Sequence, residues 1–151
     1  MAIGIGGGMC TFFMGYFSFG GNIISIPLIT SAIGVSLLIL SLFPMSQAYQ
    51  IKEDKKRGDI TFAVKYGLSG IRILYRYFYI TGLMMVTFGL YLKLESIAFL
   101  FLVLGFIIGA VNMHQINKLE GKIREYDKIM RIKYFSGSSF SSFLLILIIY
   151  Y

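Results

Sequence analysis

Residues 23–46 read IISIPLITSAIGVSLLILSLFPMS and contain no charged side chain. A helix needs roughly 20 apolar residues to cross about 30 Å of hydrocarbon, and this stretch meets that length. Its middle, Ile33–Leu42, is almost wholly aliphatic. Pro27 falls in the first turn or so, where a missing N–H costs little, and Pro44 lies where it should kink or end a helix. The stretch therefore predicts a membrane-spanning helix.

The rest of the chain has the same character. Of its 151 residues 57% are hydrophobic and only 14% are charged, whereas a soluble domain carries about a quarter charged residues. Charge is absent from 2–51, 77–92 and 134–151. We therefore predict an all-α integral membrane protein forming a single polytopic domain over 1–151, with four to five transmembrane helices. The expected spans are 2–19, 23–46, 77–92, 96–113 and 136–151.

A basic stretch at 60–76 differs from an ordinary span. Lys65, Ser69, Arg72 and Arg76 follow one another at spacings of 4, 3 and 4, which places them on one stripe of a helix. Such a pattern is typical of an amphipathic helix lying in the membrane interface. We expect Lys65, Arg72 and Arg76 to bind anionic lipid headgroups, with a bound anionic substrate or an enzyme acting on lipids as alternatives.

A second pattern follows the span at 96–113. Apolar side chains recur at spacings of 3, 4, 3 and 4, which is an a/d seam two heptads long; they are Ile116, Leu119, Ile123, Tyr126 and Met130. Only Gly121 interrupts the helical pattern. This predicts that the fourth helix is long and continues as a cytoplasmic extension over 112–133, beyond the bilayer. The seam would bind a partner or this chain's own 52–76 segment.

Two GxxxG spacings, Gly4 with Gly8 and Gly105 with Gly109, lie in the apolar spans. Glycines at this spacing let a neighbouring helix approach closely. We therefore add these four glycines to the predicted partner-binding residues. The expected partners are other membrane protein subunits.

Basic residues are unevenly distributed along the chain. Thirteen of the fourteen Lys and Arg fall in 52–76 and 118–133, and Lys93 is the exception. The positive-inside rule places these segments and the N-terminus on the cytoplasmic or matrix side. The membrane would be a prokaryotic plasma membrane or the inner membrane of an organelle. The net charge of +7 indicates anionic lipids as partners rather than nucleic acid, because the cations flank apolar spans.

Side chains for catalysis are sparse. No span interior carries an ionisable residue, and the chain has one histidine and one cysteine, His114 and Cys10. Glu53, Asp54 and Asp59 lie among lysines and arginine, which predicts a solvated, charge-balanced loop rather than a metal site. These features favour a protein that is not an enzyme and that needs no metal or cofactor.

The segment from Phe19 to Leu28, FGGNIISIPL, resembles the glycine-rich, proline-containing motif of the sulfite exporter (TauE/SafE-like) transporters. Those transporters are built from repeated halves, and this chain would correspond to roughly one half. The resemblance implies a small transporter or channel for an anion or small solute, working as a homo-oligomer. The main hypothesis from the residues themselves is a structural or accessory subunit of a larger membrane complex.

Overall fold

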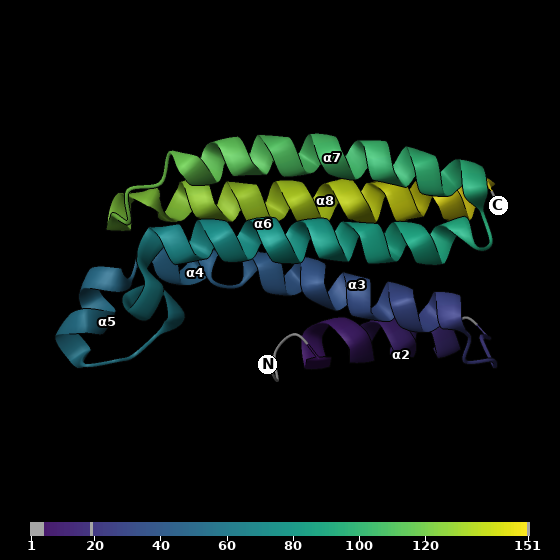
Figure 1. Ribbon diagram of the computed structural model, residues 1–151, viewed down its shortest axis with the longest axis horizontal. Helices are drawn as coiled ribbons and strands as arrows, with labels where there is room; N and C mark the ends of the chain where they lie inside the picture. Colours follow the sequence, from purple (N-terminus) through teal and green to yellow (C-terminus); the bar gives the residue numbers. More distant parts are fainter. Residues whose placement is uncertain (1–4, 19, 151) are drawn as a thin grey trace. The chain divides into compact units, whose positions relative to one another are not determined.

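The computed structural model describes the backbone of residues 5–18 and 20–150, and the side chains of 7–18 and 20–143. Within these ranges the chain is helical and contains no strand (Figure 1). The elements in chain order are η1 Ile5–Cys10 (a π-helix), α2 Thr11–Ser18, α3 Ile26–Leu42, α4 Met45–Ala48, α5 Ile51–Arg57, α6 Phe62–Tyr91, α7 Glu95–Asn117, η2 Ile123–Glu125 (a 3₁₀ helix) and α8 Tyr126–Tyr150.

Three segments among the described residues are helical, long and apolar enough to cross a membrane: Ile26–Ala48, Phe62–Tyr91 and Glu95–Asn117. Large apolar side chains such as Phe99 and Ile107 are exposed on them, as expected where lipid replaces water. The predicted class, an all-α integral membrane protein, is confirmed. The predicted first span, 2–19, coincides with η1 and α2 where the structure describes it.

The chain divides into two compact units. Unit 1 consists of Met1–Phe43 and Leu74–Gly105, and unit 2 of Pro44–Ile73 and Phe106–Tyr151. Helices α6 and α7 each contribute residues to both units. Two of the chain's Lys and Arg residues, Arg76 and Lys93, belong to unit 1. All the others belong to unit 2.

Close contact between α3 and α6 holds unit 1 together. A Cβ atom added at Gly82 would lie 2.8 Å from the carbonyl oxygen of Gly34, and one added at Gly34 would lie 2.8 Å from the carbonyl oxygen of Gly82. Two turns further, a Cβ at Gly89 would lie 2.7 Å from the carbonyl oxygen of Pro27. The two backbones can approach this closely only because side chains are absent at the crossing.

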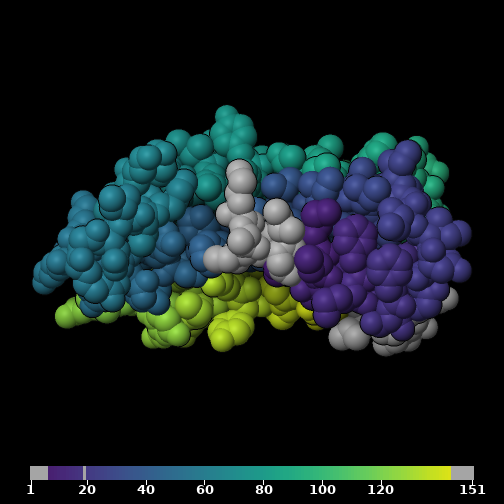
Figure 2. All heavy atoms as spheres, turned by 90° about the horizontal axis from the view of Figure 1, so that it is seen from below, coloured from purple at the N-terminus to yellow at the C-terminus, as the bar shows by residue number. Residues whose placement is uncertain are grey.

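One glycine of each pair named from the sequence packs within the chain. Gly8 of η1 lies against Ser36 of α3, where an added Cβ would come within 2.5 Å, and Figure 2 shows the N-terminal segment covering α3 on this face. Gly105 lies against Leu83, and its carbonyl oxygen accepts a 2.7 Å hydrogen bond from the Tyr79 hydroxyl.

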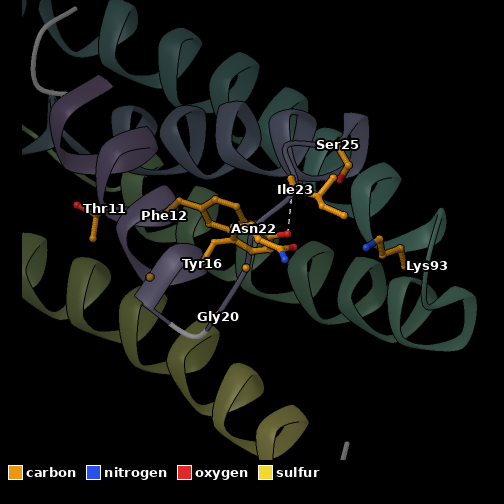
Figure 3. Close-up of a pocket in the computed structure, with 10 residues that line it drawn as sticks. Thr11, Phe12, Tyr16, Gly20, Asn22, Ile23, Ser25 and Lys93 are labelled. Atoms are coloured by element: carbon orange, nitrogen blue, oxygen red, sulfur yellow. Dashed lines mark hydrogen bonds between the residues drawn. The ribbon is translucent and has the colours of Figure 1, made fainter.

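The turn between α2 and α3 breaks the helical path as its glycines predict. Gly20 has φ +85°, a value that non-glycine residues rarely adopt. The backbone N–H groups of Gly20 and Gly21 donate to the carbonyl oxygens of Phe17 and Tyr16. The Tyr16 hydroxyl then donates to the carbonyl oxygen of Ile23 at 2.9 Å (Figure 3). Helix α3 starts immediately after this turn, with Pro27 in its first turn.

The sequence pattern predicted one long helix through residue 133, but α7 ends at Asn117 and α8 begins at Tyr126. Gly121 at the break has φ +75°. The Glu125 carboxylate accepts hydrogen bonds from the backbone N–H groups of Glu120, Gly121 and Lys122. These bonds satisfy donors that a continuous helix would otherwise bond internally, so the turn competes with the helix.

The interfacial helix expected over 60–76 is not a separate element. It is the first part of α6, which continues to Tyr91. The helix has one residue with non-helical backbone angles, Gly67, at φ +64° and ψ −167°. Lys65 and Arg72 lie on opposite sides of this residue in the sequence, so an unbroken helical stripe does not connect them.

Unit 2 also contains a buried polar pair. The Asn112 side chain is 0% exposed, and its amide donates a 2.6 Å hydrogen bond to the Ser136 hydroxyl. That hydroxyl donates in turn to the carbonyl oxygen of Ile132. The pair connects α7 to α8, and hydrogen bonds of this kind help membrane helices to associate.

Replacing Gly82 by Ala should lower the melting temperature of the detergent-solubilised protein, because the new methyl group meets the Gly34 carbonyl and the backbone must shift. Overpacking of this kind costs about 1–3 kcal/mol. The matched control is Gly137→Ala in α8, where an added Cβ meets nothing within 4 Å and should be neutral or slightly stabilising. Equal melting temperatures for the two variants would contradict the α3–α6 contact.

Replacing Glu125 by Ala should loosen the α7–α8 turn, because three backbone donors lose a charged acceptor; such a loss costs about 1–3 kcal/mol. Limited proteolysis at 118–125 should accelerate. Glu120→Ala serves as the control, since its carboxylate is exposed and pairs with Lys122 at the surface. The capping role is refuted if both variants are cleaved at the wild-type rate.

Candidate functional site

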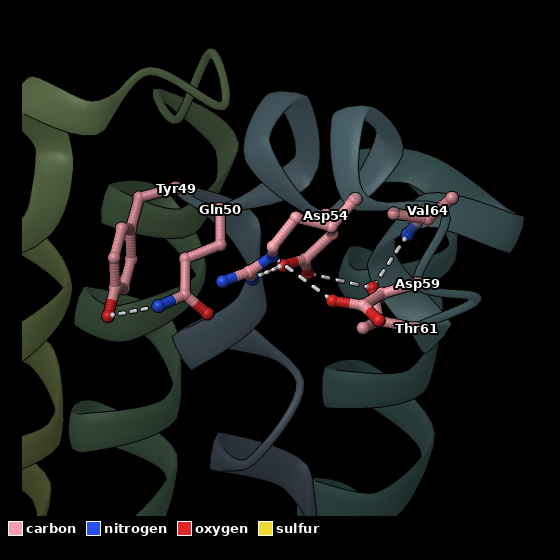
Figure 4. A network of polar contacts seen from close by, with 7 residues as sticks. Tyr49, Gln50, Asp54, Asp59, Thr61 and Val64 are labelled. Atoms are coloured by element: carbon pink, nitrogen blue, oxygen red, sulfur yellow. Dashed lines mark hydrogen bonds and ion pairs between the residues drawn. The ribbon is translucent and has the colours of Figure 1, made fainter.

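The clearest polar site in unit 2 surrounds Asp54 of α5 (Figure 4). The Asp54 side chain is only 3% exposed, and its carboxylate accepts hydrogen bonds from Arg57 at 2.5 Å and from the Thr61 hydroxyl at 3.2 Å. A buried carboxylate is costly unless it is paired and hydrogen-bonded. Here both oxygens have a partner, so the charge is held in one position.

Local sequence produces this arrangement. Helix α5 ends at Gly58, whose φ of +81° is a typical left-handed C-cap. Its N–H bonds back to the carbonyl oxygens of Asp54 and Lys55, and the N–H of Asp59 donates to the Asp54 carbonyl at 2.9 Å. The reversal of the chain at this point brings Thr61 back beside the Asp54 side chain.

The start of α6 is satisfied by side chains of the same segment. The Thr61 hydroxyl accepts the N–H of Val64 at 3.3 Å, which is the usual role of an N-cap residue. The side-chain oxygen of Gln47 in α4 accepts the N–H of Ala63, also at 3.3 Å. Thr61 therefore both caps α6 and holds Asp54.

Cations surround the buried carboxylate. Arg57 is 61% exposed and contacts Asp59 at 3.1 Å in addition to Asp54. The hydrogen bond to Asp54 and the charge of Asp59 raise the pKa of Arg57 above its usual value. Lys52, Lys55 and Lys56 are exposed, and none of them forms an ion pair with another described residue. The four cations of 52–59 thus outnumber its three carboxylates by one, and the three lysines are available to an anion.

The described carboxylates do not form a cluster that could bind a metal ion. Among the residues that the structure describes, no three His, Cys, Asp or Glu side chains lie together as a metal site would require. Glu53 and Asp59 are exposed, as the prediction of a solvated loop implied, but that prediction was wrong for Asp54.

Other side chains of unit 2 connect this segment to α7 and α8. The Lys133 ammonium donates a 2.6 Å hydrogen bond to the Ser46 hydroxyl, and the rings of Tyr49 and Tyr126 meet edge to face at 5.3 Å. Arg72 donates from Nη2 to the carbonyl oxygens of Asn117 and Leu119 at 3.1 and 3.0 Å. A cation in this position satisfies carbonyls at the end of α7 and opposes the helix dipole.

The residues predicted to bind lipid headgroups have different surroundings. Arg72 is bonded to backbone carbonyls, whereas the exposed Lys65 lies over the ring of Tyr66, 5.2 Å from its centroid. Arg76 is exposed in unit 1. Headgroup binding by these residues stays a prediction.

The residues predicted to bind a protein partner are also dispersed. Ile116 and Leu119 are buried, whereas Ile123 and Tyr126 are exposed beyond the break. Met130 and Gly109 are partly buried, Gly8 and Gly105 are buried inside unit 1, and Gly4 lies outside the described residues. Because α7 ends at Asn117, no single helix carries the seam.

Comparison with known proteins identifies the chain's relatives. Residues 1–135 match the model of the UbiA prenyltransferase family. The chain belongs to the UbiA prenyltransferase family. Searches of the curated proteins and of the solved structures found no match. UbiA proteins are integral membrane, all-α enzymes, in agreement with the helices described above.

This membership corrects the predicted functions. The hypothesis of a structural or accessory subunit is wrong, and so is the alternative of a transporter or channel, because the UbiA family consists of prenyltransferases. The prediction that the chain is not an enzyme is wrong for the same reason. The scarcity of ionisable residues in the predicted spans was therefore a poor guide to catalysis.

Asp54 is the residue that the sequence reasoning misjudged. Asp54 is flanked by charged residues in the sequence, and this pattern predicts a side chain exposed to water. A signal was nevertheless present: Gly58 is a typical helix stop and Thr61 a typical helix start. Together they predict a tight helix–turn–helix, which would bring residues 54 and 61 together.

Replacing Asp54 by Ala should expose the α5–α6 turn, because Arg57 and Thr61 both lose their acceptor. A lost buried hydrogen-bond partner costs about 1–3 kcal/mol. Amide hydrogen exchange over 58–64 should therefore accelerate by roughly ten- to hundredfold. Glu53→Ala on the same helix should leave this exchange unchanged, and equal exchange in the two variants would show that Asp54 does not organise the turn.

Proposed function

We propose that this protein is a membrane-embedded prenyltransferase, which moves a prenyl group from a prenyl diphosphate to an acceptor molecule. The observation that carries the proposal is the match of residues 1–135 to the UbiA prenyltransferase family. The apolar helices agree with it, since both the prenyl chain and the protein would reside in the bilayer.

The reaction makes two demands on a protein. The bond between the prenyl carbon and the diphosphate oxygen breaks, and the diphosphate leaves with the electron pair. A nucleophilic atom of the acceptor forms the new bond to that carbon and loses a proton. The protein must hold a polyanion whose charge grows as the bond breaks, and preorganised cations are an effective way to stabilise such charge.

The α5 segment supports this assignment. Lys52, Lys55 and Lys56 are exposed without ion pairs among the described residues, and Arg57 is fixed beside them by Asp54. We assign the diphosphate to this positive surface. The buried Asp54 orients Arg57 and would not itself contact the anion.

The experiment is a transfer assay with the purified protein in nanodiscs. Farnesyl and geranylgeranyl diphosphates labelled in the prenyl chain would be offered with a panel of aromatic and alcohol acceptors. Labelled product together with released diphosphate supports the proposal. If no prenyl diphosphate is consumed and none raises the melting temperature, the proposal fails.

Site variants test the placement of the diphosphate. Lys55→Gln combined with Lys56→Gln should raise the KM for the prenyl diphosphate by about thirtyfold, at about fivefold for each cation removed. The control removes two exposed cations elsewhere in unit 2, Arg124→Gln with Lys128→Gln. An equal change in both double variants would indicate only a general loss of positive charge.

A further inference from the structure

A second candidate site lies in unit 1, and none of the residues assigned above belongs to that unit. A pocket of about 840 Å³ opens between the α2–α3 turn and the turn that joins α6 to α7 (Figure 3). Phe12 and Tyr16 of α2 give it aromatic surface, and Lys93 gives it its one charge. In Figure 3 the Lys93 ammonium points toward the Asn22 side of the pocket.

The wall of the pocket is formed before any ligand arrives. Gly21 packs so closely on Tyr16 that an added Cβ would lie 2.3 Å from its ring. The Tyr16 hydroxyl also donates a hydrogen bond to the backbone carbonyl oxygen of Ile23, which follows the α2–α3 turn. A preformed wall reduces the entropy that binding would otherwise cost.

Several polar side chains line the pocket without a partner among the described residues. The side chains of Thr11, Asn22, Ser25 and Lys93 line it, and none of them makes a hydrogen bond or ion pair with another described residue. Ser25 directly precedes α3, so the positive end of that helix dipole lies on the same side. The pocket therefore combines donors with apolar surface.

The charge of Lys93 is uncompensated within unit 1. Glu95 is the only acidic residue of that unit, and it lines a different pocket, beside Tyr91 and Ser96. No ion pair joins Lys93 to Glu95 among the described side chains. A single cation beside hydroxyl and amide groups matches a ligand with one negative charge.

We propose that this pocket binds the phosphate headgroup of an anionic phospholipid, with Lys93 on the phosphate and Phe12 and Tyr16 against the glycerol and acyl region. One cation suits a phosphodiester, which carries one charge, better than a diphosphate, which carries several. Aromatic side chains commonly occupy this headgroup level of a bilayer. This proposal does not depend on the proposed transfer chemistry.

The chain contains no tryptophan, which allows a direct test. Phe12→Trp would place a single fluorophore in the pocket of the full-length protein. Brominated phosphatidylglycerol and brominated phosphatidylcholine, which quench tryptophan on contact, would be titrated into mixed micelles. We expect half-quenching at about fivefold lower mole fraction for phosphatidylglycerol, the preference that one cation provides.

Adding Lys93→Gln to the reporter should abolish that preference, whereas adding Lys128→Gln, an exposed lysine of α8, should keep it. A second reporter, Ile23→Trp, guards against local damage from the first and should give the same preference. The proposal is overturned if both lipids quench equally, or if Lys93→Gln retains the preference. Relief of quenching by micromolar farnesyl diphosphate would also overturn it, since the pocket would then be a site for the substrate.

Discussion

Backbone groups at helix ends are the constraint on which this structure depends. In hydrocarbon each N–H and C=O must find a partner inside the protein, and a helix leaves several without one at each end. The described chain meets this demand with side chains: Gln47 and Thr61 at the start of α6, Glu125 at the α7–α8 turn, and Arg72 at the end of α7. These polar side chains are consequently found at the ends of helices.

That constraint also favours charged side chains outside the most apolar helices. A catalytic charge in the middle of an apolar helix would be expensive to desolvate. In unit 2 the short helix α5 carries the charges instead, and the reversal at Gly58 fixes the buried Asp54 against Arg57 and Thr61. The candidate span Ile26–Ala48 contains no charged residue, whereas the first part of α6 carries Lys65, Arg72 and Arg76.

Packing inside unit 1 follows a different rule. Glycine removes side-chain volume, so the backbones of α3 and α6 approach at Gly34 and Gly82. The same device brings η1 onto α3 at Gly8. Of the glycines at GxxxG spacing, Gly8 and Gly105 pack against other helices of the chain, but the α3–α6 crossing uses single glycines on two different helices. Spacing within one helix gives no information on such a pair.

Hydropathy and charge distribution alone determined the membrane class, the main apolar helices and the breaks at Gly20 and Pro44, because these depend on local composition and backbone preference. The turn at Gly121 was missed because the apolar repeat of 3 and 4 continues through it, whereas the break is stabilised by the Glu125 carboxylate and by Arg72, which donates to carbonyl oxygens at the end of α7. The burial of Asp54 was missed for a related reason. Its energy depends on Arg57 and Thr61 reaching it after the chain reverses, and only the tertiary structure decides that.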